Sequence, residues 1–153
     1  MNISEYQNYQ ERKRHTAAAF PYNTYLCSIP LDFTHVPLHW HAELELIVIK
    51  KGRGFVSVDL NRSPVSAGDL VFIRPGQLHS IDQQEGCSME YENIIFRLEL
   101  LMGRGEDLCG IRFLLPMERD RGHGAVHMRK GVQGYEDFME GVRLLDELCL
   151  GKR

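Results

Sequence analysis

The feature that most constrains the fold is a period of two in the residue pattern from position 39 to about position 100. In FVSVDL (55–60), for example, apolar side chains recur at every second position, and LVFI (70–73) is a short apolar run. Between these stretches lie segments typical of turns: KKGRG (50–54), LNRS (60–63), SAGD (66–69), RPG (74–76) and QQEG (83–86). Short strands separated by turns at this spacing are typical of a β-sandwich or a small β-barrel, so the sequence predicts a mainly β fold.

After residue 126 the period of the apolar residues changes to three or four, which predicts an amphipathic helix. Gly134 and Gly141 weaken this helix by about 1 kcal/mol each, relative to alanine, where they are interior. We therefore expect the helix to need a surface to pack on, either its own barrel or a second subunit. The apolar positions are Val132, Tyr135, Phe138, Met139, Val142, Leu145 and Cys149.

The organisation predicted from these patterns has three parts. Residues 1–20 form a loosely structured polar arm, residues 21–118 form the barrel, and residues 119–153 form a loop and the helix. YLCSIPL (25–31) is expected to be a strand that bends or ends at Pro30.

Composition excludes several classes of function. A net charge of −3 over 153 residues gives no electrostatic basis for nucleic-acid binding, so we expect no binding of duplex DNA by this chain alone. The apolar stretch LELIVI (44–49) is too short to span a membrane, and the first twenty residues lack the apolar core of a secretory signal. Four scattered cysteines form neither a CxxC motif nor a disulfide framework, which favours a reduced, cytoplasmic protein.

The segment HWHAELE (39–45) contains the residues most suited to binding chemistry. If one strand runs from 39 to 45, then His39, His41 and Glu45 point to the same side, because side chains alternate along a strand. The apolar residues that follow Glu45 occupy both sides of the strand, which is typical of a strand covered on both faces. The histidines and the glutamate are therefore predicted to lie in a partly enclosed cavity.

The spacing H-x-H-x3-E-x6-G, from His39 to Gly52, resembles the first motif of the cupin superfamily, and Gly68 to His79 resembles the second. The resemblance implies a cupin-like double-stranded β-helix, a jelly-roll barrel, in which His39, His41, Glu45 and His79 correspond to the metal-binding residues. The sequence departs from the cupin pattern at Phe33, Arg74 and Gln83, where cupins have glycine, proline and asparagine.

Three imidazoles and a carboxylate suit a divalent metal ion such as Zn, Ni, Fe or Mn, with coordination positions left open for water or a ligand. The alternative is that these four residues hydrogen-bond only one another or an organic ligand.

The longer stretch from residue 20 to about residue 150 resembles the N-terminal ligand-binding and dimerisation domain, the sensor domain, of AraC-type transcription regulators. GDLVFIRPGQLHSI (68–81) and the tyrosine-led strand after it carry this resemblance most clearly. It implies a small-molecule effector in the barrel, a homodimer formed through the C-terminal helix, and DNA binding only through a C-terminal helix-turn-helix domain that we expect to be missing from this chain.

Two further side chains have predicted roles. Arg74 is a candidate ligand for an anionic group of the effector, because guanidinium binds carboxylates in bidentate fashion; the alternative is an arginine in a solvent-facing loop. Trp40 is predicted to pack on the face opposite the two histidines. The histidines at 15, 35, 123 and 127 are interpreted as surface or loop residues, and RDRGHG (119–124) as a loop.

The sensor interpretation has two rivals. The same four residues would also serve a small metal-dependent cupin enzyme, such as a dioxygenase or an isomerase. The third possibility is a dimerisation domain whose pocket binds nothing.

Overall fold

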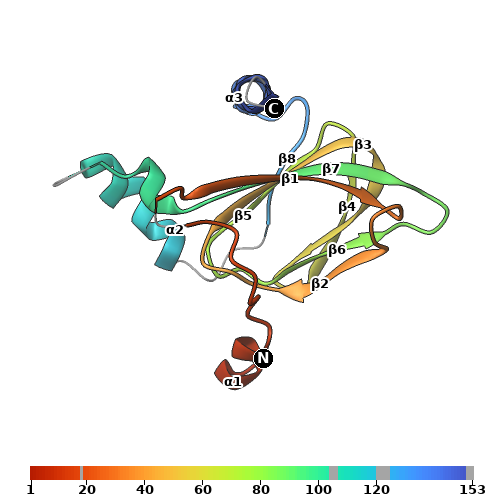
Figure 1. The fold of residues 1–153 in the computed structure, drawn as a ribbon, viewed down its shortest axis with the longest axis horizontal. Coiled ribbons are helices and arrows are strands. Elements are labelled where there is room, and N and C mark those ends of the chain that lie inside the picture. Colours follow the sequence, from red (N-terminus) through yellow and green to blue (C-terminus); the bar gives the residue numbers. More distant parts are fainter. Residues whose placement is uncertain (18, 104–106, 120–124, 151–153) are drawn as a thin grey trace.

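The protein is described by a computed structural model that covers residues 1–17, 19–103, 107–119 and 125–150. Its strands pair only in antiparallel fashion and form two sheets that face each other around a common interior (Figure 1). The prediction of a mainly β fold is confirmed. The strands are β1 (Tyr22–Ile29), β2 (His35–His39), β3 (Leu44–Val58), β4 (Asn61–Ser66), β5 (Leu70–Ile73), β6 (His79–Gln83), β7 (Met89–Phe96) and β8 (Val126–Met128).

The long strand β3 belongs to both sheets. Its first part pairs with β7 and β5 in the order β1-β7-β3-β5-β8, and its second part pairs with β4 and β6, while β2 pairs with β6. The turn predicted at KKGRG (50–54) is therefore wrong, because β3 runs through this segment. The turn-like composition marks the register shift between Ile49 and Lys51, where the strand passes from one sheet to the other.

Gly52 is required at this crossing. Its φ of 73° lies in the left-handed region, and a Cβ atom there would lie 1.9 Å from the carbonyl oxygen of Ser88. The glycine thus allows β3 to pass close to the backbone at Ser88, and the strand does not reverse direction here.

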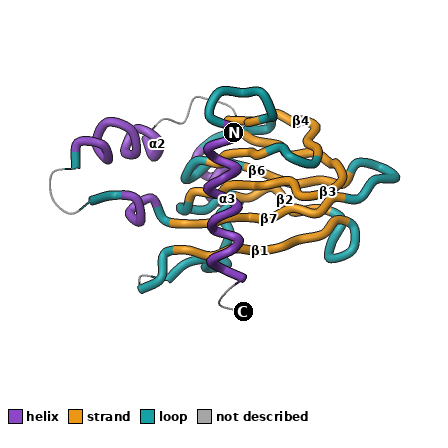
Figure 2. The backbone as a smooth tube through the Cα atoms, turned by 90° about the horizontal axis from the view of Figure 1, so that it is seen from above, coloured by secondary structure: helices purple, strands orange, loops and turns teal. Residues whose placement is uncertain are grey.

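The apolar residues of β3 divide between two cores, as predicted for a strand covered on both faces. Ile47 and Ile49 lie in the barrel interior. Leu44, Leu46 and Val48 lie on the outer face, in a second cluster that includes Val142 of helix α3 (Tyr135–Leu150). Figure 2 shows α3 lying across the strands of this sheet.

Helix α3 packs on its own barrel, one of the two surfaces considered above. Val142 is 3% exposed, and Met139 and Leu145 pack against the same cluster. Burying a valine of this kind stabilises the fold by about 1.5–3 kcal/mol. Phe138 and Val132, which belong to the same sequence stripe, remain exposed.

The N-terminal arm is more ordered than its composition predicts. Residues Ile3–Asn8 form helix α1, and Asn2 and Glu5 form a capping box at its start. The ring of Tyr6 stacks on Trp40 at a centroid distance of 4.7 Å, and the Trp40 indole donates a hydrogen bond of 2.8 Å to the Tyr6 carbonyl. Trp40 therefore packs as predicted, and its partner is the arm.

The described part of the segment between β7 and β8 includes several short helices. It contains a 3₁₀ helix (Leu98–Leu101), a π-helical turn (Gly110–Leu114) and helix α2 (Leu115–Arg119). Most of the predicted RDRGHG loop, including His123, lies outside the described residues. Among the helices described, none has the length and apolar character needed to cross a membrane.

Candidate ligand and metal site

The predicted continuous strand from 39 to 45 is wrong. Strand β2 ends at His39 and β3 begins at Leu44, and the chain turns between them. Trp40 leaves the sheet to pair with Gln10 of the arm. The backbone conformation of this turn, rather than simple alternation, directs the side chain of His41 into the barrel, where it is buried.

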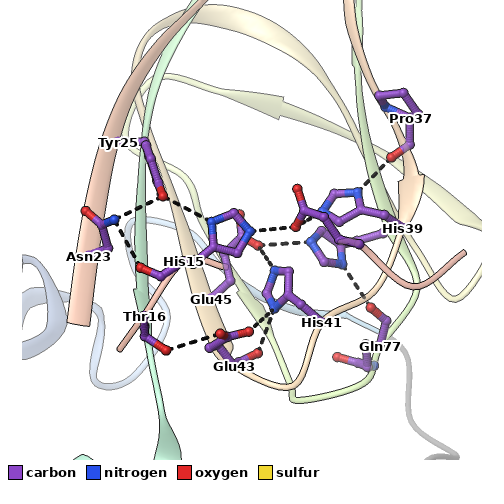
Figure 3. Close-up of polar contacts among 12 residues, drawn as sticks. His15, Thr16, Asn23, Tyr25, Pro37, His39, His41, Glu43, Glu45 and Gln77 are labelled. Atoms are coloured by element: carbon purple, nitrogen blue, oxygen red, sulfur yellow. Dashed lines mark hydrogen bonds and ion pairs between the residues drawn. The ribbon is translucent and has the colours of Figure 1, made fainter. Parts of the chain in front are cut away.

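The four side chains implied by the cupin resemblance nevertheless converge. The Oε2 atom of Glu45 lies 2.8 Å from Nε2 of His41 and 2.9 Å from Nε2 of His79. His39 joins them because β2 pairs with β6, with His39 directly opposite His79. Donor atoms of all four residues lie within 4.8 Å of one another, and Figure 3 shows His39, His41 and Glu45 gathered in the barrel.

Burial and the neighbouring imidazoles shift the pKa of Glu45, which is 2% exposed, in opposite directions. Burial raises the pKa of Glu45, but the nearby imidazoles of His79 and His41 outweigh burial and hold its pKa well below its ordinary value. Burial lowers the pKa of His41, and the hydrogen bond that the imidazole donates to Glu45, together with the carboxylate charge, more than reverses this effect. For His39, burial and the neighbouring His79 together lower the pKa. The site therefore holds an ionised carboxylate among imidazoles.

The rings of His39, His41 and His79 are all oriented by the same kind of contact. Each Nδ1 lies within hydrogen-bonding distance of a backbone carbonyl: Pro37 at 2.7 Å for His39, Glu43 at 3.1 Å for His41, and Gln77 at 2.9 Å for His79 (Figure 3). A carbonyl oxygen can only accept, so each Nδ1 carries the proton. In a neutral ring the lone pair is then on Nε2, and this is how metal-binding histidines are held.

The same geometry tests whether a metal ion fits. With neutral rings, the Nε2 lone pairs of His41 and His79 face an oxygen lone pair of Glu45 at 2.8 and 2.9 Å. Two acceptors at this distance repel unless a proton or a cation lies between them. Three imidazole nitrogens and one carboxylate oxygen are also a donor set that first-row divalent ions accept. The residues fit a metal ion.

A cavity of about 350 Å³ opens beside these residues. This volume is at the lower end of the range of small-molecule sites. The walls combine polar groups with apolar side chains from both sheets. Besides His39, His41 and Glu45, they include Tyr25, Cys27, Val36, Ile81, Tyr91, Asn93 and Ile95.

The structure does not bring Arg74 to this cavity. Its buried side chain lines a different cavity together with Phe72, Met117 and Met128, on the side of the barrel near α2 and β8. The backbone N–H of Arg74 donates to the side-chain oxygen of Gln77 at 2.9 Å. Arg74 thus contacts a residue that orients His79, but it does not line the pocket.

Three residues near the site carry no signal in the motif spacing. Gln77 supplies the carbonyl that holds His79. His15, interpreted as a surface or loop residue, lies in a loop, but its side chain is only 8% exposed and lines the cavity with Glu11. The only sequence trace of this pair is a histidine four positions after a glutamate in a charged arm. His35 is exposed and also lines the cavity, whereas His127 lies 3.2 Å from Asp69, outside the pocket lining.

Strand order and site together define a cupin-like barrel. A cupin protein from Bacteroides fragilis has a similar structure, with a TM-score of 0.50 and 22% sequence identity over 64% of this chain and 92% of that one. Residues 30–122 match the family model described as the AraC-like ligand binding domain, and the chain belongs to this family.

The uncharacterized HTH-type transcriptional regulator YdeC from Bacillus subtilis (strain 168) is 31% identical over 86 residues. The match covers 56% of this chain and 30% of that regulator, so the chain spans less than a third of the relative's length.

Proposed function

We propose that this chain is the effector-sensing domain of an AraC-type transcription regulator and that a small molecule binds in the 350 Å³ cavity of the barrel. Membership of the AraC-like ligand binding domain family supports this proposal, as does the similarity to an HTH-type regulator. The observation that carries the proposed site is the common orientation of three histidines, each with Nδ1 on a backbone carbonyl and Nε2 toward the centre of the site.

The cation in this proposal is a divalent Zn, Ni, Fe or Mn ion held by His39, His41, Glu45 and His79. When bound, such an ion would act as a Lewis acid that attracts an oxygen or nitrogen of the effector. The backbone carbonyls of Pro37, Glu43 and Gln77 would keep the three rings oriented. Arg74 is left out of the proposed effector site because it lies in the other cavity.

Signalling requires that the effector prefer one arrangement of the protein over another. Two parts of the chain are suited to respond to the effector. The arm lines the cavity through Glu11 and His15, and helix α3 covers the outer face of the sheet that contains β7 and the first part of β3. DNA binding belongs in this proposal to a separate helix-turn-helix domain.

We place the homodimer interface on the exposed surface of α3, which includes Phe138, Leu144 and Leu148. An apolar groove of about 510 Å³ lies between α3 and the barrel, lined among others by Phe96, Leu100 and Leu101. Exposed apolar surface of this kind is typical of an interaction site.

A metal-dependent cupin enzyme, such as a dioxygenase or an isomerase, is the second candidate, because His39, His41, Glu45 and His79 leave coordination positions open for a substrate. The family of the chain favours sensing without turnover.

The proposal is tested by calorimetric titration with zinc and by thermal unfolding with a panel of sugars, carboxylic acids and aromatic compounds. We expect one ion per chain and a raised melting temperature with at least one class of compound. His41→Ala should abolish ion binding, whereas His127→Ala, outside the pocket, should not. The absence of both ion binding and any shift in melting temperature would contradict the proposal. Turnover of a bound compound would favour the enzyme.

A further inference from the structure

The N-terminal arm brings a second group of metal-binding side chains to the pocket. Donor atoms of Glu11, His15 and His41 lie within 4.8 Å of one another. Glu11 and His15 precede the cupin-like motifs, and His41 belongs to both this group and the four convergent residues of the barrel. The arm and the barrel therefore meet at one shared imidazole.

Backbone pairing fixes the position of Glu11. The N–H of Trp40 donates to the carbonyl of Tyr9 at 3.0 Å, and the N–H of Glu11 donates to the carbonyl of Trp40 at 2.9 Å. Because Trp40 lies between His39 and His41 in the sequence, this pairing places Glu11 beside both histidines. Its Oε2 atom lies 2.5 Å from Nε2 of His15 and 3.8 Å from Nε2 of His39.

The ring of His15 also has an outer partner on Nδ1, which is a hydroxyl rather than a backbone carbonyl. Its Nδ1 lies 3.2 Å from the hydroxyl of Tyr25, and the amide of Asn23 donates both to that hydroxyl, at 3.0 Å, and to the His15 carbonyl, at 3.1 Å (Figure 3). These contacts leave Nε2 directed at Glu11 and place the ring 5.2 Å from that of His41, between centroids. An outer partner on Nδ1 and an inward Nε2 is the arrangement of a metal-binding histidine.

The arm is anchored on both sides of this pair. Before it, Tyr6 stacks on Trp40 and its hydroxyl donates to the carbonyl of Gly76 at 2.6 Å. After it, the hydroxyl of Thr16 donates to Glu43 at 3.2 Å and accepts from Arg97 at 3.1 Å. Glu11 and His15 are thus held at the pocket from both ends.

We propose that Glu11 and His15 are metal ligands supplied by the arm, so that the divalent cation in the pocket is held jointly by the arm and by barrel residues that include His41 and Glu45. This inference rests on the metal site of the proposed function. Glu11 together with Glu45 would supply two negative charges, which balance the charge of one divalent cation. Occupancy of the site would then fasten the arm to the barrel, and loss of the ion would loosen it.

The test measures zinc affinity and arm cleavage in the same samples. Zinc affinity is measured by chelator competition, and the arm is probed with trypsin, because Arg12, Lys13 and Arg14 are exposed beside Glu11. Native protein is compared with Glu11→Gln and His15→Ala. Glu85→Gln and His127→Ala serve as controls, since they remove a carboxylate and an imidazole outside the pocket lining. Each variant is compared with and without zinc, so that any direct effect of a substitution on trypsin cancels.

We expect zinc to slow cleavage of the native arm, and Glu11→Gln and His15→Ala to lower zinc affinity about tenfold or more and to abolish the protection. The controls should behave like the native protein. Native protein that binds zinc without any protection of the arm, or arm variants with native affinity, would overturn this inference alone. Failure of the native protein to bind zinc would overturn both this inference and the metal site of the proposed function.

Discussion

The Nε2 atom of His79 lies 2.9 Å from the Oε2 atom of Glu45, although 34 positions separate the two residues in the chain. This contact joins β6 to β3 inside the barrel. The same oxygen lies 2.8 Å from Nε2 of His41, so one buried carboxylate fixes two imidazoles.

Glu45→Gln should destabilise the protein even in the presence of a chelator. The amide keeps the size of the side chain but removes the charge that two imidazoles face, and leaving buried groups poorly paired costs about 1–3 kcal/mol. Urea unfolding measures the change in the free energy of unfolding. Glu90→Gln, at an exposed glutamate paired with Lys51, is the matched control and should change it by no more than about 0.5 kcal/mol. Equal effects of the two substitutions would refute this role of Glu45.

Lys50→Met should loosen helix α3. The Lys50 ammonium lies 2.7 Å from Asp146 of α3 and 3.1 Å from Glu92, which is 4% exposed. Without the lysine, the buried carboxylate of Glu92 faces the carboxylate of Asp146. We therefore expect the free energy of unfolding to fall by about 1–3 kcal/mol and hydrogen exchange along α3 to become faster.

Arg143→Gln is the matched control for Lys50→Met. Arg143 pairs with Glu140 and Glu147 on the exposed face of the same helix, and such solvent-exposed pairs contribute little to stability. If both variants accelerate exchange in α3 to the same extent, Lys50 does not fasten the helix.

The pH dependence of stability should contain a contribution from Glu92. Burial raises the pKa of Glu92 above its ordinary value of 4.5, and the neighbouring Asp146 raises it further. The folded protein therefore binds this proton more tightly than the unfolded chain, and the resulting stability is present below pH 4.5 and is lost as the pH rises through the folded-state pKa. Relative to Glu92→Gln, which cannot titrate, the native protein should lose stability as the pH rises above 4.5 in urea unfolding. A difference that stays constant with pH would contradict the raised pKa.

Phe138→Asp should weaken the proposed dimer without unfolding the chain, because Phe138 is 41% exposed on α3. Sedimentation velocity over a range of concentrations should show the dimer of the native protein and mostly monomer for the variant. Leu60→Ser replaces an even more exposed apolar residue in the turn between β3 and β4 and should leave the dimer intact. A native protein that is monomeric at all concentrations would rule out this interface.

The main architecture could be predicted from the sequence because its apolar residues show two periodicities, a period of two in the strands and a period of three to four in the C-terminal helix. The alternation from 39 to 100 indicates the barrel, and the apolar outer face of β3 at Leu44, Leu46 and Val48 already requires a covering element, which is α3. KKGRG was misread because a strand that crosses between sheets uses the same glycine and charged residues as a turn.

The candidate site was only partly predictable. Motif spacing identified His39, His41, Glu45 and His79, and the structure brings them together through a turn that strand alternation does not foresee. Glu11 and His15 could not be found, because they reach the pocket through backbone pairing of the arm with Trp40, which leaves no periodicity in the sequence. Arg74 was chosen for its chemistry, and its position at the start of a loop directs it to another cavity.

The most direct test of the proposed site is X-ray absorption spectroscopy of the zinc-loaded native protein, with metal content measured in parallel for His79→Ala. We predict one zinc ion per chain, with nitrogen and oxygen ligands at about 2.0–2.2 Å and several imidazoles in the shell, and loss of the ion in His79→Ala. Zinc bound with native stoichiometry and an unchanged spectrum in His79→Ala would contradict the account, because the ion would then lie outside the pocket that His39, His41, Glu45 and His79 define.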